Sequence, residues 1–356
     1  MQRRQFLQSL SALLFLQPFP NRRKRYDPIF DDLQLKVCDV HMHLIGLSPK
    51  NGCYVNNKTQ KSIVYRLQKL FLKIDSNGSL EDQDRQYVDW LISTIESSPD
   101  HHSGILLAMD GVYDASGRLD EVQTPFLIPN DYLFNITDRS QKLFPGASVN
   151  PHRRDALTEL DRVAEKGAIF IKWIPNSQAI DPSDKKLIPF YRKMVEVGLP
   201  LLSHCGTEYA IPAYDQKLGN PKLLQLPLEE EVKVIVAHCA VEGRDENGSY
   251  FFHFLEMLES YPNLMGEISA LSLLHKIHRL RYLLDNPSYF DRLYYGSDFP
   301  LQFFPATSPY YFLGRMTLEE AAEIQAIDNV LARNVATLYK IGVPRDCLER
   351  GLELLK

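Results

Sequence analysis

Residues 37–44 read Val-Cys-Asp-Val-His-Met-His-Leu and predict a short β-strand, because β-branched and apolar residues alternate with polar ones. Successive side chains of a strand point to opposite faces, so Asp39, His41 and His43 point to the same face. Imidazole nitrogens bind zinc, iron and similar ions, and the Asp39 carboxylate could orient a histidine from behind. A surface strand that binds nothing can carry the same pattern, so this stretch alone leaves both interpretations open.

Short apolar runs recur along the chain after this stretch, and most of them are followed by an amphipathic helix. They predict further strands at 104–110, 144–150, 168–174, 199–205, 232–239, 264–270 and 292–298. The predicted helices are 84–95, 154–166, 184–197, 250–261, 273–284 and 329–339, with one more opened by a capping box at 317–320. Such apolar runs are typical of parallel strands that are covered on both faces. Together with the first strand they make eight, which predicts a single (β/α)8 TIM barrel, an α/β fold, with an open doubly wound sheet as the alternative.

The composition describes a globular protein. The 356 residues are 44% hydrophobic and 24% charged, with a net charge of −5 and no long apolar run. We therefore expect no stable membrane span, and the lack of a basic tract in the body argues against a nucleic-acid partner. Five cysteines, an odd number, do not suggest a disulfide framework. Cys38, Cys205 and Cys239, which stand beside histidines or near them, are interpreted as buried thiols.

The first 25 residues are treated apart from the fold. Two arginines at positions 3 and 4 precede the short apolar segment 9–16, and this order resembles a twin-arginine export signal. The segment is too short to span a bilayer, and no clear small-residue cleavage site follows it. We expect residues 1–25 to be a signal or an N-terminal tail that directs export to the periplasm, with a cytoplasmic location as the alternative. Residues 26–356 are then the barrel, with a loop insertion at about 44–84 of the kind that often forms a lid.

Residues of metal-binding type stand at the ends of the predicted strands. In chain order these are His41, His43, Lys172, His204, His238 and Asp298. Each lies at the C-terminal tip of an apolar run, and TIM-barrel active sites are built on that face. A lone histidine or lysine there is usually a satisfied core or rim residue, but six at equivalent positions predict a metal site.

Four segments resemble, in the same order, the signatures of the amidohydrolase superfamily. They are Asp39–His43, Leu202–Gly206, Ile235–Cys239 and Tyr295–Pro300. The closest resemblance is to the amidohydrolase-related branch, which also contains aminocarboxymuconate-semialdehyde decarboxylase and other nonoxidative decarboxylases. It covers about residues 35–340. These motifs are specific for the superfamily but do not specify a substrate.

The resemblance implies roles for the strand-end residues. In the single-metal branch the ligands of a divalent ion, with zinc favoured, would be His41, His43, His204 and Asp298. His238 would then act as acid and base beside the ion. In the two-metal branch a carboxylated Lys172 would bridge two ions, and His204 and His238 would bind the second. One ion is favoured and two remain open; without carboxylation Lys172 would contact a substrate carboxylate or Glu208.

The implied chemistry starts from a water molecule on the ion, whose pKa falls to roughly 7. Asp298 would take the proton of this water and later deliver it to the leaving group, while His238 would stabilise negative charge on the substrate oxygen. The favoured function is a metal-dependent hydrolase that cleaves an amide, ester or lactone bond in a small metabolite. The alternative is a zinc-dependent nonoxidative decarboxylase that acts on a small carboxylic acid.

Four further residues are expected to support the site or to contact the substrate: Asp39, Asn176, Glu208 and Glu267. Glu267 stands within a predicted strand, where a carboxylate is costly to bury unless it is paired. Dimerisation is common in the branch that the chain resembles, so a homodimer is left open.

Overall fold

The computed structural model describes residues 35–61, 65, 74–75, 77–99, 102–301 and 306–356. The expected export signal at 1–25 and most of the expected insertion's apolar stretch at 63–72 lie outside these residues. No helix within the described ranges is long and apolar enough to cross a membrane. The five cysteines are all buried and none forms a disulfide, as expected.

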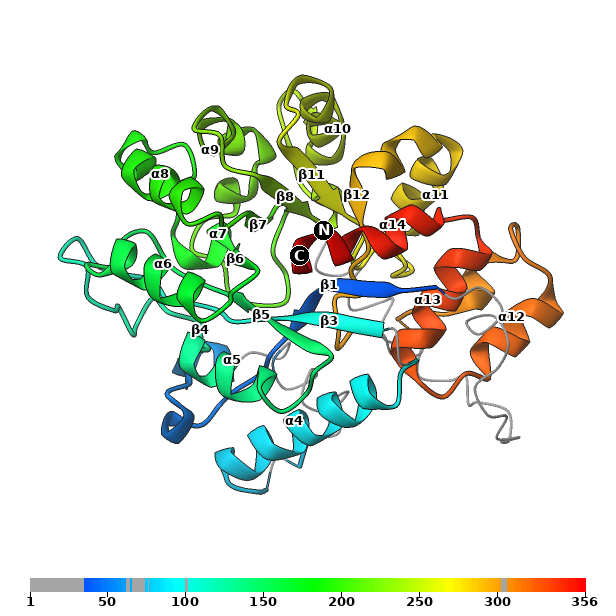
Figure 1. Ribbon diagram of the computed structural model, residues 1–356, viewed down its shortest axis with the longest axis horizontal. Helices are drawn as coiled ribbons and strands as arrows, with labels where there is room; N and C mark the ends of the chain where they lie inside the picture. Colours follow the sequence, from blue (N-terminus) through cyan, green and yellow to red (C-terminus); the bar gives the residue numbers. More distant parts are fainter. Residues whose placement is uncertain (1–34, 62–64, 66–73, 76, 100–101, 302–305) are drawn as a thin grey trace.

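Eight parallel strands form one sheet that curls into a nearly closed barrel inside a ring of helices (Figure 1). Around the barrel they are β1 (Val37–His43), β3 (His102–Leu107), β5 (Leu143–Ala147), β6 (Phe170–Trp173), β7 (Leu201–His204), β8 (Val234–Ala237), β11 (Leu264–Glu267) and β12 (Leu293–Tyr294). All eight predicted strands are present and pair in sequence order, so the predicted TIM barrel is confirmed and the doubly wound alternative is wrong. Most of the strands end earlier than predicted.

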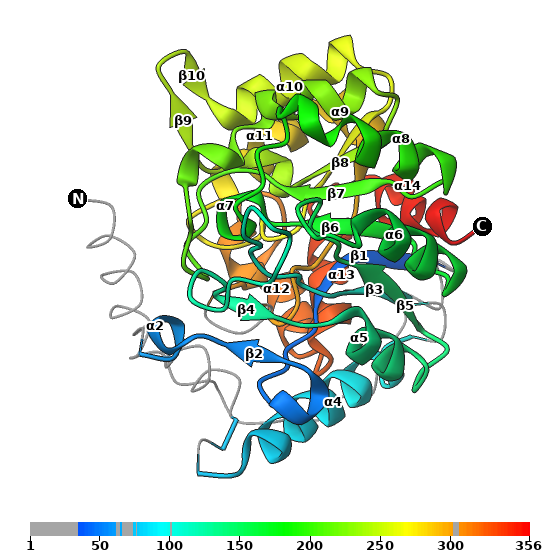
Figure 2. The same cartoon turned by 90° about the vertical axis from the view of Figure 1, so that its left-hand side faces the viewer.

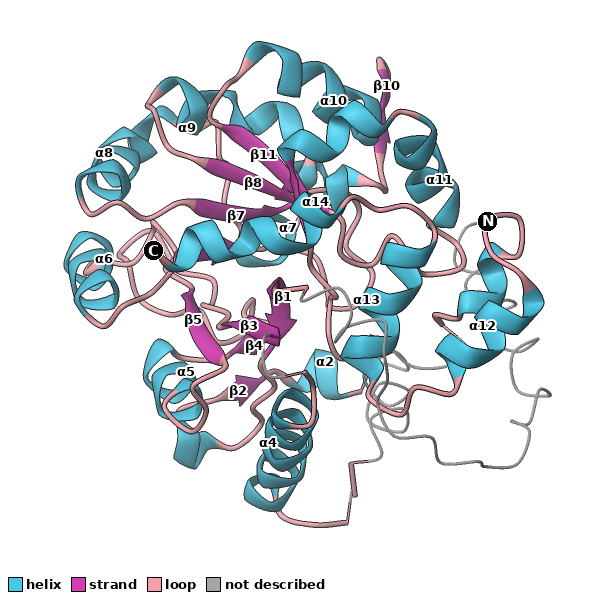
Figure 3. Cartoon of the chain, turned by 45° about the vertical axis from the view of Figure 1, so that its right-hand side comes forward, coloured by secondary structure: helices cyan, strands magenta, loops and turns pink. Residues whose placement is uncertain are grey.

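The ring of helices covers the outside of the barrel (Figure 3). Its longer members are α4 (Leu80–Glu96), α5 (Asn130–Thr137), α6 (Ala156–Glu165), α8 (Ile188–Glu196), α10 (Tyr250–Ser260), α11 (Ile277–Asp285), α12 (Leu318–Gln325) and α13 (Val330–Lys340). The short helices are α2 (Asn57–Gln60), α7 (Pro175–Gln178), α9 (Gln225–Glu229) and α14 (Arg345–Glu349), of which α14 lies near the middle of the ring in Figure 1. The predicted capping box is confirmed at the start of α12, where Thr317 and Glu320 cap each other's backbone N–H groups.

The barrel closes between β1 and the segment that follows β12. Asp298 N donates to His41 O at 2.9 Å, and His43 N donates to Phe299 O at 2.8 Å. We call this junction the seam and define it by residues 40–43 and 295–299. Since both segments carry predicted site residues, the same stretch of backbone closes the barrel and builds the site.

The opposite end of the barrel is covered by the end of the chain. The last turn, η9 (Arg350–Leu355), packs Leu352 and Leu354 against the inner cluster that includes Val40 and Ile235. Gly351 lies so close to β1 that a Cβ there would stand 2.7 Å from Cys38 O. Figure 1 shows this C-terminal turn near the middle of the ring. The other end of the barrel, which carries the predicted site residues, is therefore surrounded by loops.

Part of the expected insertion at 44–84 contains short structure of its own. Strand β2 (Tyr54–Val55) pairs antiparallel with β4 (Phe126–Leu127), beside α4 (Figure 2). Asp84 of α4 accepts hydrogen bonds from Leu47 N at 2.6 Å and from Ser48 N at 3.1 Å, which fixes the start of the insertion. A second small sheet joins β9 (Arg244–Asp245) to β10 (Gly248–Ser249).

Candidate metal centre

Three predicted ligands from the two sides of the seam form a compact triangle. His41 Nε2 lies 3.2 Å from His43 Nε2, and Asp298 Oδ1 lies 2.9 Å from His43 Nε2 and 3.6 Å from His41 Nε2. Bonds of about 2.0–2.1 Å to a tetrahedral ion place its ligand atoms about 3.3–3.4 Å apart. The three separations bracket that value, so these donor atoms suit one face of a tetrahedral metal site.

His238 joins this triangle from the end of β8. Its ring stacks on His41 with 4.9 Å between ring centroids. Ligand atoms of His41, His238 and Asp298 all lie within 4.8 Å of one another. His238 is therefore close enough to bind an ion or to act beside one.

His204 ends β7 and stands outside that group of three. Its ring centroid is 5.3 Å from that of His238. His204 Nε2 is buried and has no hydrogen-bond partner in the described part of the chain; Glu208 Oε2, at 3.6 Å, is too far for one. A buried nitrogen without a hydrogen-bond partner lowers the stability of the fold, and a divalent cation bound to it would supply the missing partner. The residues present therefore suit a metal. His204, however, is not part of the compact group that His41, His238 and Asp298 form.

Lys172, at the end of β6, points into the same cluster. Its Nζ lies 3.2 Å from His41 Nε2, and the residue is only 2% exposed. Burial, as the largest cause, lowers the pKa of Lys172 to about 8. In this conformation the expected contact with Glu208 is replaced by one with a histidine.

Burial also sets the charge of the candidate ligands. It lowers the pKa of His41 and His204 well below the usual value and that of His238 to about 3. Burial alone would raise the pKa of Asp298, but the neighbouring histidines, and the hydrogen bond from His43, hold it well below its usual range. Neutral imidazoles beside an ionised carboxylate are the forms that bind a cation.

The backbone at two of these strand ends is strained. His238, Cys239 and Ala240 have φ angles of 56°, 49° and 49°, and Asp298 has a φ of 62°. Each non-glycine residue in the left-handed region costs roughly 1–2 kcal/mol. The chain thus adopts costly turns where it presents His238 and Asp298 to the cluster, as is common at functional sites.

Glu267, the last residue of β11, lies behind the histidines and is fully buried. Its Oε1 lies 2.9 Å from His41 Nδ1 and accepts hydrogen bonds from His238 N and Ser269 Oγ, each at 2.8 Å. The sequence pointed to Glu267 through the cost of burying its charge, but Ser269 was missed. The sequence marks Ser269 only by its position two residues after the end of a strand, and many serines without a function have such a position.

Asp39 supports the seam by a different contact from the one expected. Its Oδ1 accepts hydrogen bonds from His41 N at 3.0 Å and from Ser297 N at 2.8 Å. The carboxylate therefore holds the backbone on both sides of the seam, and it fixes the position of His41 within β1.

Asn176 and Glu208 organise the loops around the cluster. Asn176 Nδ2 donates to Gly206 O at 2.9 Å, which ties the loop after β6 to the loop after β7. Glu208 Oε1 accepts from Ile211 N at 3.1 Å, while its other oxygen is the atom near His204. Asn176 is thus engaged with backbone, whereas one oxygen of Glu208 lies near a predicted ligand.

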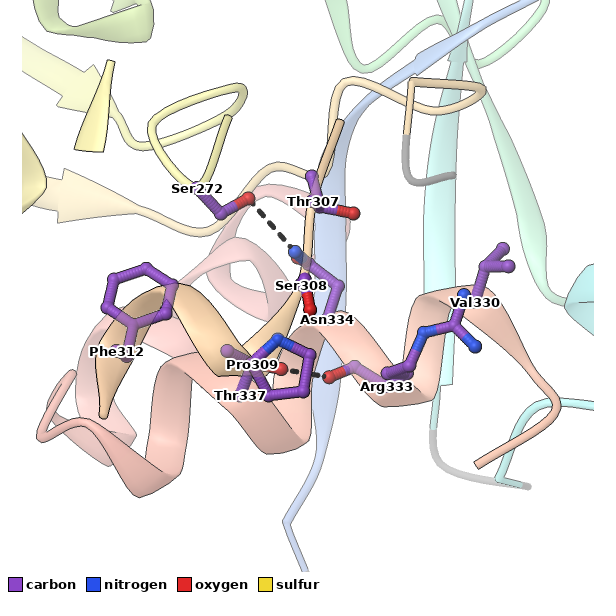
Figure 4. A pocket seen from close by; sticks show the side chains of 9 residues that line it. All are labelled: Ser272, Thr307, Ser308, Pro309, Phe312, Val330, Arg333, Asn334 and Thr337. Carbon is purple, nitrogen blue, oxygen red and sulfur yellow. Dashed lines mark hydrogen bonds between the residues drawn. The ribbon is translucent and has the colours of Figure 1, made fainter. Parts of the chain in front are cut away.

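A small hollow lies between α13, η8 (Pro309–Phe312) and the loop after β11 (Figure 4). It is lined by Ser272, Thr307, Ser308, Pro309, Phe312, Val330, Arg333, Asn334 and Thr337. It has room for about one water molecule, and Asn334 Nδ2 donates to Ser272 Oγ across it at 3.2 Å. None of the predicted site residues lines it.

Comparison with known proteins identifies the family of the chain. A family model described as Amidohydrolase matches residues 38–341, which include every residue of the cluster. No curated protein matches the chain.

Several solved structures share the fold at low sequence identity. An uncharacterized TIM-barrel protein from Bordetella bronchiseptica is 16% identical, with 85% of this chain and 99% of that chain covered and a TM-score of 0.52. The apo form of IDCase from Metarhizium anisopliae is 12% identical, with coverages of 90% and 97% and a TM-score of 0.50. 5-Carboxyvanillate decarboxylase from Sphingomonas paucimobilis is 12% identical, with coverages of 90% and 98% and a TM-score of 0.50. At these identities the likeness concerns the fold alone.

Proposed function

Because the chain belongs to the amidohydrolase family, we propose that it is a metal-dependent hydrolase that cleaves an amide, ester or lactone bond in a small metabolite. The observation that supports this most directly is the triangle of His41, His43 and Asp298 with His238 beside it. Its nitrogen and oxygen donors suit zinc, and one ion is favoured.

A divalent ion bound by these residues would lower the pKa of a water molecule to roughly 7 and so supply a nucleophile at neutral pH. Asp298 would accept the proton of that water and return it to the leaving nitrogen or oxygen. His238 would stabilise the negative charge on the substrate oxygen, since its ring lies against that of His41. Glu267 would hold His41 in place through its contact with Nδ1.

Nonoxidative decarboxylation of a small carboxylic acid is the second candidate function. Lys172 favours it, because an ammonium group in contact with His41 could pair with a substrate carboxylate. In this reaction a protonated side chain would donate its proton to the carbon from which carbon dioxide leaves. One of the structures with the same fold carries the name of a decarboxylase, which keeps this candidate open.

The test is the metal content per chain of wild type and Lys172→Ala, purified without added metal. About one ion in both would support a single-metal site with His238 as acid and base. Two ions in wild type, with fewer in the variant, would indicate a carboxylated lysine bridge and favour the hydrolase. No ion in either protein, and none taken up from added zinc, would refute the proposal.

The two reactions are separated by their products. We would assay the metal-loaded protein against lactones, amides, esters and aromatic or unsaturated carboxylic acids. Hydrolysis of an ester or lactone releases a proton with the new acid, and hydrolysis of an amide releases an amine, whereas decarboxylation releases carbon dioxide and consumes a proton. Asp298→Asn is the matched negative control, since it keeps the size of the side chain but removes its charge.

A further inference from the structure

A carboxylate and a hydroxyl group lie together behind two of the clustered histidines. Ser269 Oγ donates to Glu267 Oε1 at 2.8 Å, and the same carboxylate oxygen lies 2.9 Å from His41 Nδ1. Ser269 Oγ also lies 2.7 Å from His238 Nδ1. All four residues are buried, so water competes little for these contacts. The Glu267–Ser269 pair therefore joins His41 to His238.

These contacts decide which nitrogen of each ring carries the proton. An ionised carboxylate only accepts, so Glu267 Oε1 favours a proton on His41 Nδ1. Ser269 has one hydroxyl proton, which goes to Glu267, so its Oγ accepts from His238 Nδ1. The main-chain oxygen of Ser269 lies 3.2 Å from the same nitrogen and can also only accept. Both rings are left with a lone pair on Nε2.

We propose that Ser269 is a positioning residue that holds His238 as the Nδ1–H tautomer and couples it to the carboxylate that orients His41. His238 then presents an unprotonated Nε2 as the atom able to bind a cation or take a proton. The effect of Ser269 on turnover rests on the proposed function, but the proton positions do not depend on it.

Two variants separate the contact between Glu267 and His41 from the contact between Ser269 and His238. Glu267→Gln removes the charge that faces His41 Nδ1, so zinc affinity should fall about 10–100-fold. Ser269→Ala keeps the 2.9 Å contact between Glu267 Oε1 and His41 Nδ1 and removes the link to His238, together with a longer 3.2 Å contact between Ser269 Oγ and His41 Nδ1. Because the carboxylate that faces His41 remains, zinc affinity should stay near that of wild type. Turnover of any substrate found should nevertheless fall about 10–100-fold in Ser269→Ala, as for other residues that orient a functional histidine.

The decisive measurement is the tautomer of His238, read from long-range 1H–15N spectra of metal-free protein labelled with 15N-histidine. The signals of His238 are identified by their loss in His238→Gln. Wild type should show a proton on Nδ1 and none on Nε2. Ser269→Ala should show a mixture of tautomers, and Ser269→Thr, which keeps a hydroxyl group, should restore the Nδ1–H form.

The matched control is Ser272→Ala, in the same loop. Ser272 is also buried, but its hydroxyl group accepts from Asn334 instead of a histidine (Figure 4). This variant should leave the His238 tautomer unchanged, since it removes a buried serine hydroxyl without touching the pair.

A proton on His238 Nε2 in wild type would overturn the proposal without the need for any variant. A wild-type tautomer in Ser269→Ala would overturn it as well, and so would a loss of zinc as large as that in Glu267→Gln. The expected tautomers in a protein that binds no zinc would support this inference and refute the proposed function, so the two failures are distinguishable.

Discussion

At the scale of single residues, the site combines side chains that the sequence marks with others that it does not. Histidines and an aspartate at strand ends are visible because few apolar runs end in such residues. Ser269 becomes visible only when β11 lies beside β8 in the barrel, which brings it within hydrogen-bond distance of His238. The chain therefore predicts the donor atoms of the site better than the groups that orient them.

His43 is the corner of the donor triangle that can be removed with least harm to the fold. Its side chain is 33% exposed, whereas that of His41 is fully buried. We expect His43→Ala to lower zinc affinity by about 100-fold or more, because a direct ligand counts for more than an outer contact. Its melting temperature without metal should stay close to that of wild type.

Zinc titration by calorimetry checks this expectation, with His278→Ala as the control, because His278 is exposed on α11. Equal zinc affinity in His43→Ala and wild type would show that the triangle does not bind the ion.

Gly296 is a residue at which an added methyl group would strike the site. A Cβ there would lie 2.9 Å from both Glu267 Oε2 and His41 Cβ. Gly296→Ala should therefore destabilise the metal-free protein by roughly 1–3 kcal/mol and weaken zinc binding. Gly314→Ala is the matched control, since a Cβ at Gly314 would have no atom within 4 Å.

Denaturant unfolding and zinc titration of both glycine variants test the close approach. A Gly296→Ala variant as stable as wild type, with unchanged zinc affinity, would contradict it.

At the scale of elements, the sequence predicted what periodicity can show and missed what depends on neighbours. All eight strands were found because buried parallel strands are apolar throughout. Helix α5 was missed: it has only eight residues, and Pro129 before it supplies no side-chain cap. Helix α4 begins at Leu80, ahead of the predicted position 84, because Ser79 caps it by accepting from Asp82 N.

The capping box of α12 is a feature whose contribution can be measured. Thr317 Oγ1 accepts from Glu320 N at 3.2 Å, and Glu320 Oε2 accepts from Thr317 N at 2.8 Å. Thr317→Ala should lower the free energy of unfolding by about 1 kcal/mol, whereas Thr317→Ser should keep most of this contribution, because serine retains the capping hydroxyl group. Urea unfolding of the two variants makes the comparison, and equal losses would show that the hydroxyl group does not cap the helix.

At the scale of the whole molecule, the candidate metal site and the closure of the barrel are one structure. The donor triangle takes His41 and His43 from one side of the seam and Asp298 from the other. Any ligand that binds the folded form alone stabilises it, by about 2.7 kcal/mol at a free concentration of 100 Kd. Here that stabilisation would act across the junction between the first and last strands.

Removal of the metal should therefore loosen the seam before the rest of the barrel. A chelator should lower the melting temperature by several degrees and speed hydrogen exchange at the amides of His43 and Asp298. The Ile169 amide, which donates to Pro145 O at 2.8 Å between β5 and β6, is the internal reference. Uniform acceleration across all strands would show that the ion does not act at the seam.

The same seam has a consequence for the protein while it is being synthesised. His43 and Asp298 are 255 residues apart in the chain, so at 5–20 residues per second the ribosome makes the second on the order of tens of seconds after the first. During that interval the nascent chain offers an ion only part of its final ligand set. Full coordination must wait for Asp298, which follows the last strand of the barrel, so the complete ligand set would form only after every strand has been synthesised.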